Sequence, residues 1–236
     1  MILVAQDTEQ ELALVTDRPD FTESAIVVPR GTPQFEMGAT WVQTDDEDEL
    51  SGAEVLIRWT VAKRIELRFG LPNYISIQDG RTTSGFSDSS IGAKFQLGPI
   101  GPNWGLALIA ATTVPTGSDE LSFNSYIPGL ILIAGRDISK TWSFGAQVDL
   151  AWPELEGDRE PVWGGTAVLG AGLSERWGTF VELAIFDLNV IDTSTLLHHG
   201  YTYLLRPNMQ FDVHGAVGLS NAGPDYLFGF GFSIRP

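Results

Sequence analysis

Apolar and polar residues alternate one by one along much of the chain. From residue 53 to residue 61 every second residue is apolar, whereas Glu54, Arg58 and Thr60 lie between them. The same period recurs at residues 65–71, 90–97, 142–150, 210–219 and 226–235. A period of two places successive side chains on opposite faces of a β-strand. These segments are therefore predicted strands with one apolar and one polar face, and helix is expected to be a minor component.

The connections between the predicted strands alternate between tight and long. Tight turns are predicted at residues 62–64, 98–103, 137–140, 174–176 and 207–209. Longer, more polar loops are predicted at residues 44–51, 76–88, 114–128, 153–161, 187–200 and 220–225. An even number of antiparallel strands can close into a barrel and leave no unpaired edge. We therefore expect an all-β fold, a closed antiparallel up-and-down transmembrane β-barrel of about twelve strands.

The membrane assignment rests on strand length and loop asymmetry. Each apolar face covers about ten residues, which is the length of a tilted strand that crosses a bilayer. A soluble barrel or sandwich also alternates, with its apolar face inward. Short turns at one end and long loops at the other are typical of outer-membrane barrels and favour the membrane. The longest uncharged stretch, Phe95–Ser118, is interrupted by proline and glycine, so no transmembrane helix is expected.

Two regions are predicted, a leader at residues 1–33 and a barrel at residues 34–236. The chain begins MILVAQ, which lacks the basic residues and the long apolar run of an export signal. Either the sequence as given carries no signal or the signal is removed or truncated.

The leader itself carries charges around an aromatic residue, namely Asp17, Arg18, Asp20 and Phe21. Pro19 and Pro29, which lie on either side of Phe21, prevent a regular helix or strand there. We hypothesise that this segment plugs or gates the lumen from the periplasmic side, with Arg18 pairing a wall carboxylate. A disordered leader is the alternative.

Composition narrows the choice of partners. The formal net charge is −16, whereas mean hydropathy is only +0.04, so acidic and apolar residues must be segregated. Acidic runs fill the loops at residues 45–49 and 154–160, and we interpret them as solvated loop tips, with cation capture at a pore mouth as the alternative. An acidic surface disfavours nucleic acid as a partner.

The chain has no cysteine, which excludes thiol catalysis, thiolate metal sites and disulfides.

The polar faces of the predicted strands are assigned to the lumen. Ionised groups in a narrow lumen are either paired in a network that fills it or hydrated along a selective path, and both interpretations stay open. The predicted lumen-lining residues are Glu54, Arg58, Glu66, Arg68, Lys94, Gln147, Asp149, Glu182, Asp212, His214 and Arg235.

Enzymatic chemistry finds little support in the sequence. No Gly-x-Ser-x-Gly elbow is present, and of the histidines His198 and His199 fall in a predicted loop, where we interpret them as solvated residues. On a strand, these neighbours would face opposite ways. No phosphate-binding loop occurs, so any transport is expected to be passive. We predict no catalytic site, no metal and no cofactor.

Several motifs resemble one known family. The segment TDRPDFTES at residues 16–24, the SGFSDSSIGAKFQL strand at residues 84–97, VPTG at residues 114–117 and the turn at Arg206–Asn208 are similar to the transporter family named for the MetA pathway of phenol degradation. The resemblance spans nearly the whole chain. It implies an outer-membrane barrel that transports aromatic or other hydrophobic compounds.

We therefore predict a passive outer-membrane channel or transporter for small molecules. Its expected partners are outer-membrane lipid, a small-molecule solute and the outer-membrane assembly machinery. The alternative is a closed barrel without transport that has a structural or partner-binding role.

Overall fold

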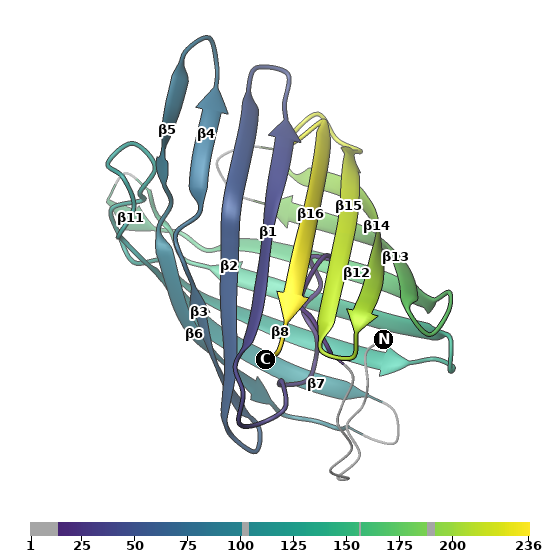
Figure 1. Cartoon of the computed structure of the whole chain (residues 1–236). Helices are drawn as coiled ribbons and strands as arrows, with labels where there is room; N and C mark the ends of the chain where they lie inside the picture. The colour runs from purple at the N-terminus through teal and green to yellow at the C-terminus, as the bar shows by residue number, and fades with distance from the viewer. Residues whose placement is uncertain (1–13, 101–103, 156, 188–191) are drawn as a thin grey trace.

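Twelve antiparallel strands form a closed barrel in the computed structural model (Figure 1). The structure describes residues 14–100, 104–155, 157–187 and 192–236. The first strand pairs with both the second and the last, so the sheet closes on itself. The prediction of about twelve strands is confirmed. The barrel strands are β1 (Gln34–Gln43), β2 (Asp48–Ala62), β3 (Ile65–Gly70), β6 (Ser89–Gln96), β7 (Gly105–Val114), β8 (Pro128–Asp137), β9 (Trp142–Ala151), β12 (Val162–Gly172), β13 (Trp177–Asp187), β14 (Ser194–Arg206), β15 (Met209–Gly218) and β16 (Tyr226–Ile234).

A hairpin extends the wall on the long-loop side. After a break at residues 71–73, where Pro72 cannot donate to the sheet, β4 (Tyr74–Gln78) pairs with the first half of β2, and β5 (Thr82–Phe86) pairs with β4. The expected loop at residues 76–88 is therefore mostly strand, which is a correction. The expectation that no edge remains is also wrong, because β5 ends the sheet with β4 as its neighbour. Figure 1 shows this hairpin rising beyond the rest of the barrel.

Two other long loops are shorter than expected. Strand β2 begins at Asp48, inside the expected loop 44–51, and β14 begins at Ser194, inside the expected loop 187–200. The loop between β9 and β12 carries a small hairpin of β10 (Glu154–Leu155) and β11 (Asp158–Arg159). The ends of these strands are rich in polar residues, as loops are, although their backbones are hydrogen-bonded in the sheet.

Asp88 organises the loop between β7 and β8. Its carboxylate accepts hydrogen bonds from the backbone amides of Thr116, Gly117 and Phe123 at 2.9–3.0 Å. Burial of Asp88 is slight and raises its pKa, but the Ser122 hydroxyl and these amides outweigh that effect and hold the pKa of Asp88 below its usual value. The loop is thus fastened to the barrel rim by one ionised side chain.

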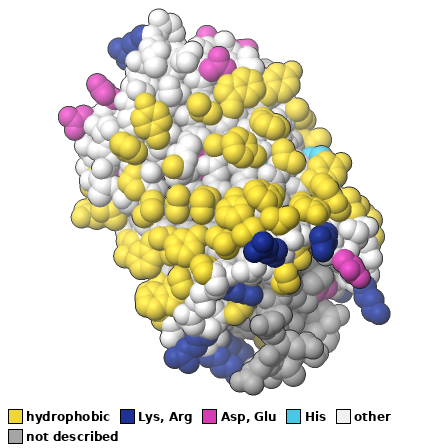
Figure 2. All heavy atoms as spheres, in the orientation of Figure 1, with side chains coloured by type: hydrophobic (Ala, Val, Ile, Leu, Met, Phe, Trp, Pro, Cys, Tyr) yellow, Lys and Arg dark blue, Asp and Glu magenta, His cyan; other side chains and the backbone are white. Residues whose placement is uncertain are grey.

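The outer surface carries a broad apolar band. Figure 2 shows hydrophobic side chains gathered across the middle of this face, with most acidic side chains above the band and most Lys and Arg side chains below it. Trp59 and Phe230 are 44% and 59% exposed, whereas Arg58 beside Trp59 is fully buried. A band of this kind is what lipid contact requires of a barrel exterior. The inward and outward sets of side chains therefore follow the predicted alternation.

Two strands depart from that alternation. The inward residues Ala107 and Ile109 of β7 and Ile133 of β8 are apolar and buried, so these strands are apolar on both faces. Ala25 from the amino-terminal segment packs against them inside the barrel. The inward face of this wall is apolar because it packs against the inner chain rather than facing water.

Candidate functional site

Residues 14–33, which we call the inner segment, lie inside the barrel. The amide of Leu14 contacts the carbonyl of Pro207 in the tight turn between β14 and β15, at 3.4 Å. Further on, the hydroxyl of Thr60 donates to the carbonyl of Val28 at 2.6 Å, and the chain then enters β1. The segment is largely buried. It thus enters and leaves at the tight-turn end, and its middle lies deep in the lumen. The part of the predicted leader at residues 1–13 lies outside the described residues.

Asp17 forms the centre of a buried cluster of charges. Its carboxylate accepts hydrogen bonds from Arg68 Nη1 at 2.5 Å and Lys94 Nζ at 2.9 Å, and Arg58 Nη1 lies 3.1 Å away. Burial alone would raise the pKa of Asp17, but Arg58, Lys94 and Arg68 outweigh it and hold this pKa well below its usual range. One acidic side chain of the inner segment therefore binds three cations of the wall.

The remaining cluster members complete the pairing. Arg58 donates to Glu36 Oε1 at 2.7 Å and to Glu66 Oε1 at 3.0 Å. Arg68 donates to both carboxylate oxygens of Glu23 at 2.8 Å. Buried ions require such partners, since removal of one member leaves a charge out of water without compensation. The lumen beside β1, β2, β3 and β6 is therefore filled with paired charges.

Arg18 binds the wall at the seam, which is the junction of the first strand β1 with the last strand β16. It pairs with Glu54 at 3.0 Å and with Asp212 at 3.4 Å. Its guanidinium lies over Gly38 of β1 and Gly231 of β16, and a Cβ at either position would come within 2.4 Å of it. These two glycines form a slot that larger residues would fill.

The tip of the inner segment is held by Glu182 of β13. Its carboxylate accepts hydrogen bonds from the amides of Phe21 at 2.9 Å and Thr22 at 2.8 Å, and from the Thr22 hydroxyl at 2.6 Å. The Thr22 hydroxyl also lies 2.6 Å from that of Thr166. The amide of Glu23 donates to Gln147 Oε1 at 2.7 Å. The tip is thus bonded to the wall facing the charge cluster.

A pair of histidines stands behind this contact. His198 Nδ1 lies 2.8 Å from Glu182, and its Nε2 lies 2.9 Å from His214 Nδ1. The ring of Phe21 stacks on His198 at a centroid distance of 4.4 Å. The interpretation of His198 as a solvated loop residue is wrong, because it lies on β14 and is fully buried. His199 faces the other way, as strand alternation requires.

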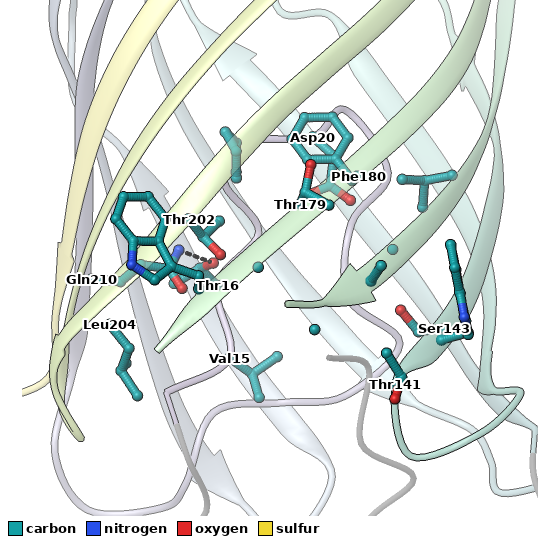
Figure 3. A pocket seen from close by; sticks show the side chains of 18 of the residues that line it. Val15, Thr16, Asp20, Thr141, Ser143, Thr179, Phe180, Thr202, Leu204 and Gln210 are labelled. Carbon is teal, nitrogen blue, oxygen red and sulfur yellow. Dashed lines mark hydrogen bonds between the residues drawn. The ribbon is translucent and has the colours of Figure 1, made fainter. Parts of the chain in front are cut away.

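A cavity of about 250 Å³ lies between the inner segment and the wall formed by β9 and β12–β15. Figure 3 shows Val15, Thr16 and Asp20 on its inner side, and Ser143, Thr202 and others on the wall. Gln210 donates a hydrogen bond to the Thr16 hydroxyl at 3.0 Å across one end. The tight turns between β8 and β9 and between β12 and β13 frame its mouth. The lumen at this end is therefore filled on one side and hollow on the other.

The predicted site residues fall into three groups. The first group pairs with Asp17 in the charge cluster and comprises Arg58, Glu66, Arg68 and Lys94. The second group lies at the seam, where Arg18 pairs with Glu54 and Asp212, and around the tip, which includes Asp20 and Phe21 and lies near Glu182, His214, Gln147 and Asp149. Arg235 follows the end of β16, where its backbone amide bonds the Asn208 carbonyl.

The sequence prediction missed other inward residues. Glu36, Gln34 and His198 are buried and hydrogen-bonded within the lumen. Alternation in residues 34–41 would have found the first two, since Phe35 and Met37 lie on either side of Glu36 and are less buried. Among the described residues, no group of His, Asp and Glu could hold a metal ion. No helix in the described part of the chain has the length and apolarity to cross a bilayer.

Comparison with known proteins agrees with this architecture. The structure is similar to the COG4313 outer membrane channel from Pseudomonas putida F1, with a TM-score of 0.71 and 14% identity, covering 90% of this chain and 98% of that one. It is also similar to the NanC porin, with a TM-score of 0.60, 11% identity and coverage of 86% and 100%. The Ralstonia pickettii toluene transporter TbuX matches with a TM-score of 0.52, 8% identity and coverage of 88% and 90%.

These likenesses concern the fold. A search of curated proteins gave no match by sequence. The apolar band and the fold place the chain in the outer membrane. Residues 16–235 match the family model described as "Putative MetA-pathway of phenol degradation", and the chain belongs to this family.

Proposed function

We propose that the protein is a passive channel for small solutes across the outer membrane, and that the inner segment is its plug. The observation that carries the proposal is the bonding of the inner segment to opposite walls, through Asp17 to Arg58, Arg68 and Lys94 and through its tip to Glu182. A strand-built wall needs no interior chain to be stable in lipid, since every barrel strand is paired around the ring. A segment held across the lumen therefore serves to control passage.

The solute is proposed to be aromatic or otherwise hydrophobic. Membership of the family supports this class, as does the apolar inner wall of β7 and β8. A structural neighbour is named a toluene transporter, which is consistent with the same class. No part of this proposal requires an energy source, because solute moves down its gradient. Lipid on the outside and the assembly machinery of the outer membrane are the proposed partners.

Removal of residues 1–30 tests the channel and the plug together. The wall begins at Gln34, so the deletion spares every barrel strand. We expect single-channel conductance to rise well above that of the full chain, in protein whose heat-modifiable migration on a gel still reports a closed barrel. Unchanged conductance would exclude a plug.

A closed barrel without transport is the second candidate. The paired charges that fill the lumen beside β1–β6 favour it, because such a network excludes water from that side. Liposome swelling with aromatic acids, sugars and amino acids separates the candidates. A channel accelerates swelling over protein-free liposomes for at least one class, whereas a closed barrel does so for none.

A further inference from the structure

The lumen is asymmetric at its tight-turn end. On the side of β2, β3 and β6, the side chains of Arg58, Lys94 and Glu66 are fully buried within the charge cluster. On the side of β9 and β12–β15, the cavity of about 250 Å³ separates the inner segment from the wall. A solute that crosses the charged side must separate several ion pairs, whereas on the cavity side the space already exists.

The cavity wall offers unused hydrogen-bonding groups. Among the described residues, neither the Ser143 hydroxyl nor the Thr202 hydroxyl has a hydrogen-bond partner, and both residues line the cavity. Glycine keeps the space beside each of them open. A Cβ at Gly170 would lie 2.7 Å from the Ser143 hydroxyl oxygen, and one at Gly178 would lie 2.6 Å from that of Thr202. Two hydroxyl groups without a partner among the described residues therefore line a cavity of about 250 Å³.

The rest of the wall is apolar rather than charged. Val168, Phe180 and Leu204 line the cavity from β12, β13 and β14. They share the inward rows of these strands with the buried residues Thr166, Glu182 and His198. The charged residues of the wall lie in the turns at the mouth, such as Lys140 and Arg176. Arg18 and Asp20 line the cavity from the inner segment, and Arg18 is paired with Glu54 and Asp212. On the facing wall, the ring of Phe180 and the isolated hydroxyl groups suit an uncharged solute that combines an apolar ring with hydroxyl groups.

The tip of the inner segment lies at the inner end of this cavity. Thr22 lines the inner end of the cavity, and its hydroxyl is bonded to Glu182 and Thr166. Beyond it, Phe21 packs with Phe186 and Leu227 against a buried apolar cluster of Ala184, Leu196 and Ala216. Displacement of Phe21 and Thr22 would therefore join an apolar inner surface to the cavity, while Asp17 keeps its pairing with Arg58, Arg68 and Lys94.

We propose that solute crosses the barrel along the wall of β9 and β12–β15, past the tip of the inner segment, and binds in the cavity through Ser143 and Thr202. The charge cluster then anchors the inner segment and forms no part of the route. This proposal rests on the proposed channel function and names its path and its solute class, an uncharged ring compound with hydroxyl groups.

Thiol modification tests the route, because the chain has no cysteine of its own. Thr202→Cys places a thiol in the cavity. Thr60→Cys is the matched control, because Thr60 also faces inward near the tight-turn end but lies on the charged side, where it bonds Val28. Each variant is reconstituted in liposomes and treated with N-ethylmaleimide, and the extent of labelling is measured by mass spectrometry. Swelling is then followed with phenyl β-D-glucoside, which combines a ring with hydroxyl groups and crosses bare lipid poorly.

The proposal expects Thr202→Cys to be labelled and its swelling rate to fall to that of protein-free liposomes. Thr60→Cys is expected either to resist labelling or to keep its rate after labelling. An unlabelled Thr202→Cys, a labelled one with an unchanged rate, or an equal block in Thr60→Cys would overturn the route. If the unmodified protein shows no swelling with any solute although its barrel is folded, the channel function itself fails, and the route fails with it.

Discussion

Replacement of Thr22 by valine removes one bond that holds the tip of the inner segment. The Thr22 hydroxyl lies 2.6 Å from a carboxylate oxygen of Glu182 and 2.6 Å from the Thr166 hydroxyl, whereas the amide of Thr22 bonds Glu182 independently and is retained. A hydrogen bond to a charged group contributes about 1.5–3 kcal/mol. A loss of about 2 kcal/mol would change the ratio of displaced to docked tip by about 30-fold.

Single-channel recording in planar bilayers measures this ratio as conducting time over non-conducting time. Thr22→Val is expected to raise it, and Thr22→Ser, which keeps the hydroxyl, is expected to stay near the unmodified protein. The reasoning is refuted if the valine and serine variants give the same ratio, or if valine lowers it. In the first case the tip contact does not control passage, and in the second the hydroxyl opposes docking.

Three further predictions concern the anchor, the lipid face and a loop. Asp17→Asn deprives three buried cations of their shared carboxylate, so we expect a loss of about 3–5 kcal/mol in stability, measured by thermal loss of heat-modifiable migration; an unchanged midpoint would contradict the role of the charge cluster. Phe230→Arg places a charge in the apolar band and should cost about 2–4 kcal/mol in folding into lipid vesicles, with Phe230→Leu as control. Because the pKa of Asp88 is lowered from 3.8, its stabilisation is present above that value and is lost only as pH falls below it. Amide exchange at Thr116 and Phe123, corrected for intrinsic rates, should stay constant from about pH 7 to pH 5 and rise below 3.8, whereas Asp88→Asn should show fast exchange throughout.

The barrel could be predicted because its strands obey a local rule. In the strand around Arg58 and Trp59, neighbouring residues differ in polarity since one faces lumen and the other lipid. Tight turns such as residues 62–64 then set the number of strands. Both the alternation and the tight turns depend on residues that are close together in the sequence, so one sequence is sufficient to predict them.

The interior could be predicted only in part. Arg58, Glu66, Arg68 and Lys94 follow from alternation, but their common partner Asp17 is separated from Lys94 by 77 residues. No local pattern specifies a pairing at that distance. The apolar inner face of β7 has the same origin, because Ile109 is inward against Ala25 of the inner segment rather than against water.

His198 was misplaced for a different reason. The polar residues before it resemble a loop, yet Ser194, Leu196 and His198 form the inward row of β14 and are all buried. A row of inward residues that mixes polar and apolar types weakens the alternation on which the prediction depends. The error in the loop boundary therefore became an error in the site.

The slot for Arg18 lies where the first and last strands of the barrel meet. Gly38 of β1 and Gly231 of β16 are direct partners across that joint, and the guanidinium covers both. A slip of one residue would bring Phe230 or Phe232 opposite Gly38 and destroy half of the slot. The seating of Arg18 therefore depends on the alignment of β1 with β16, and a barrel closed in the wrong register would lose the site that holds this part of the inner segment.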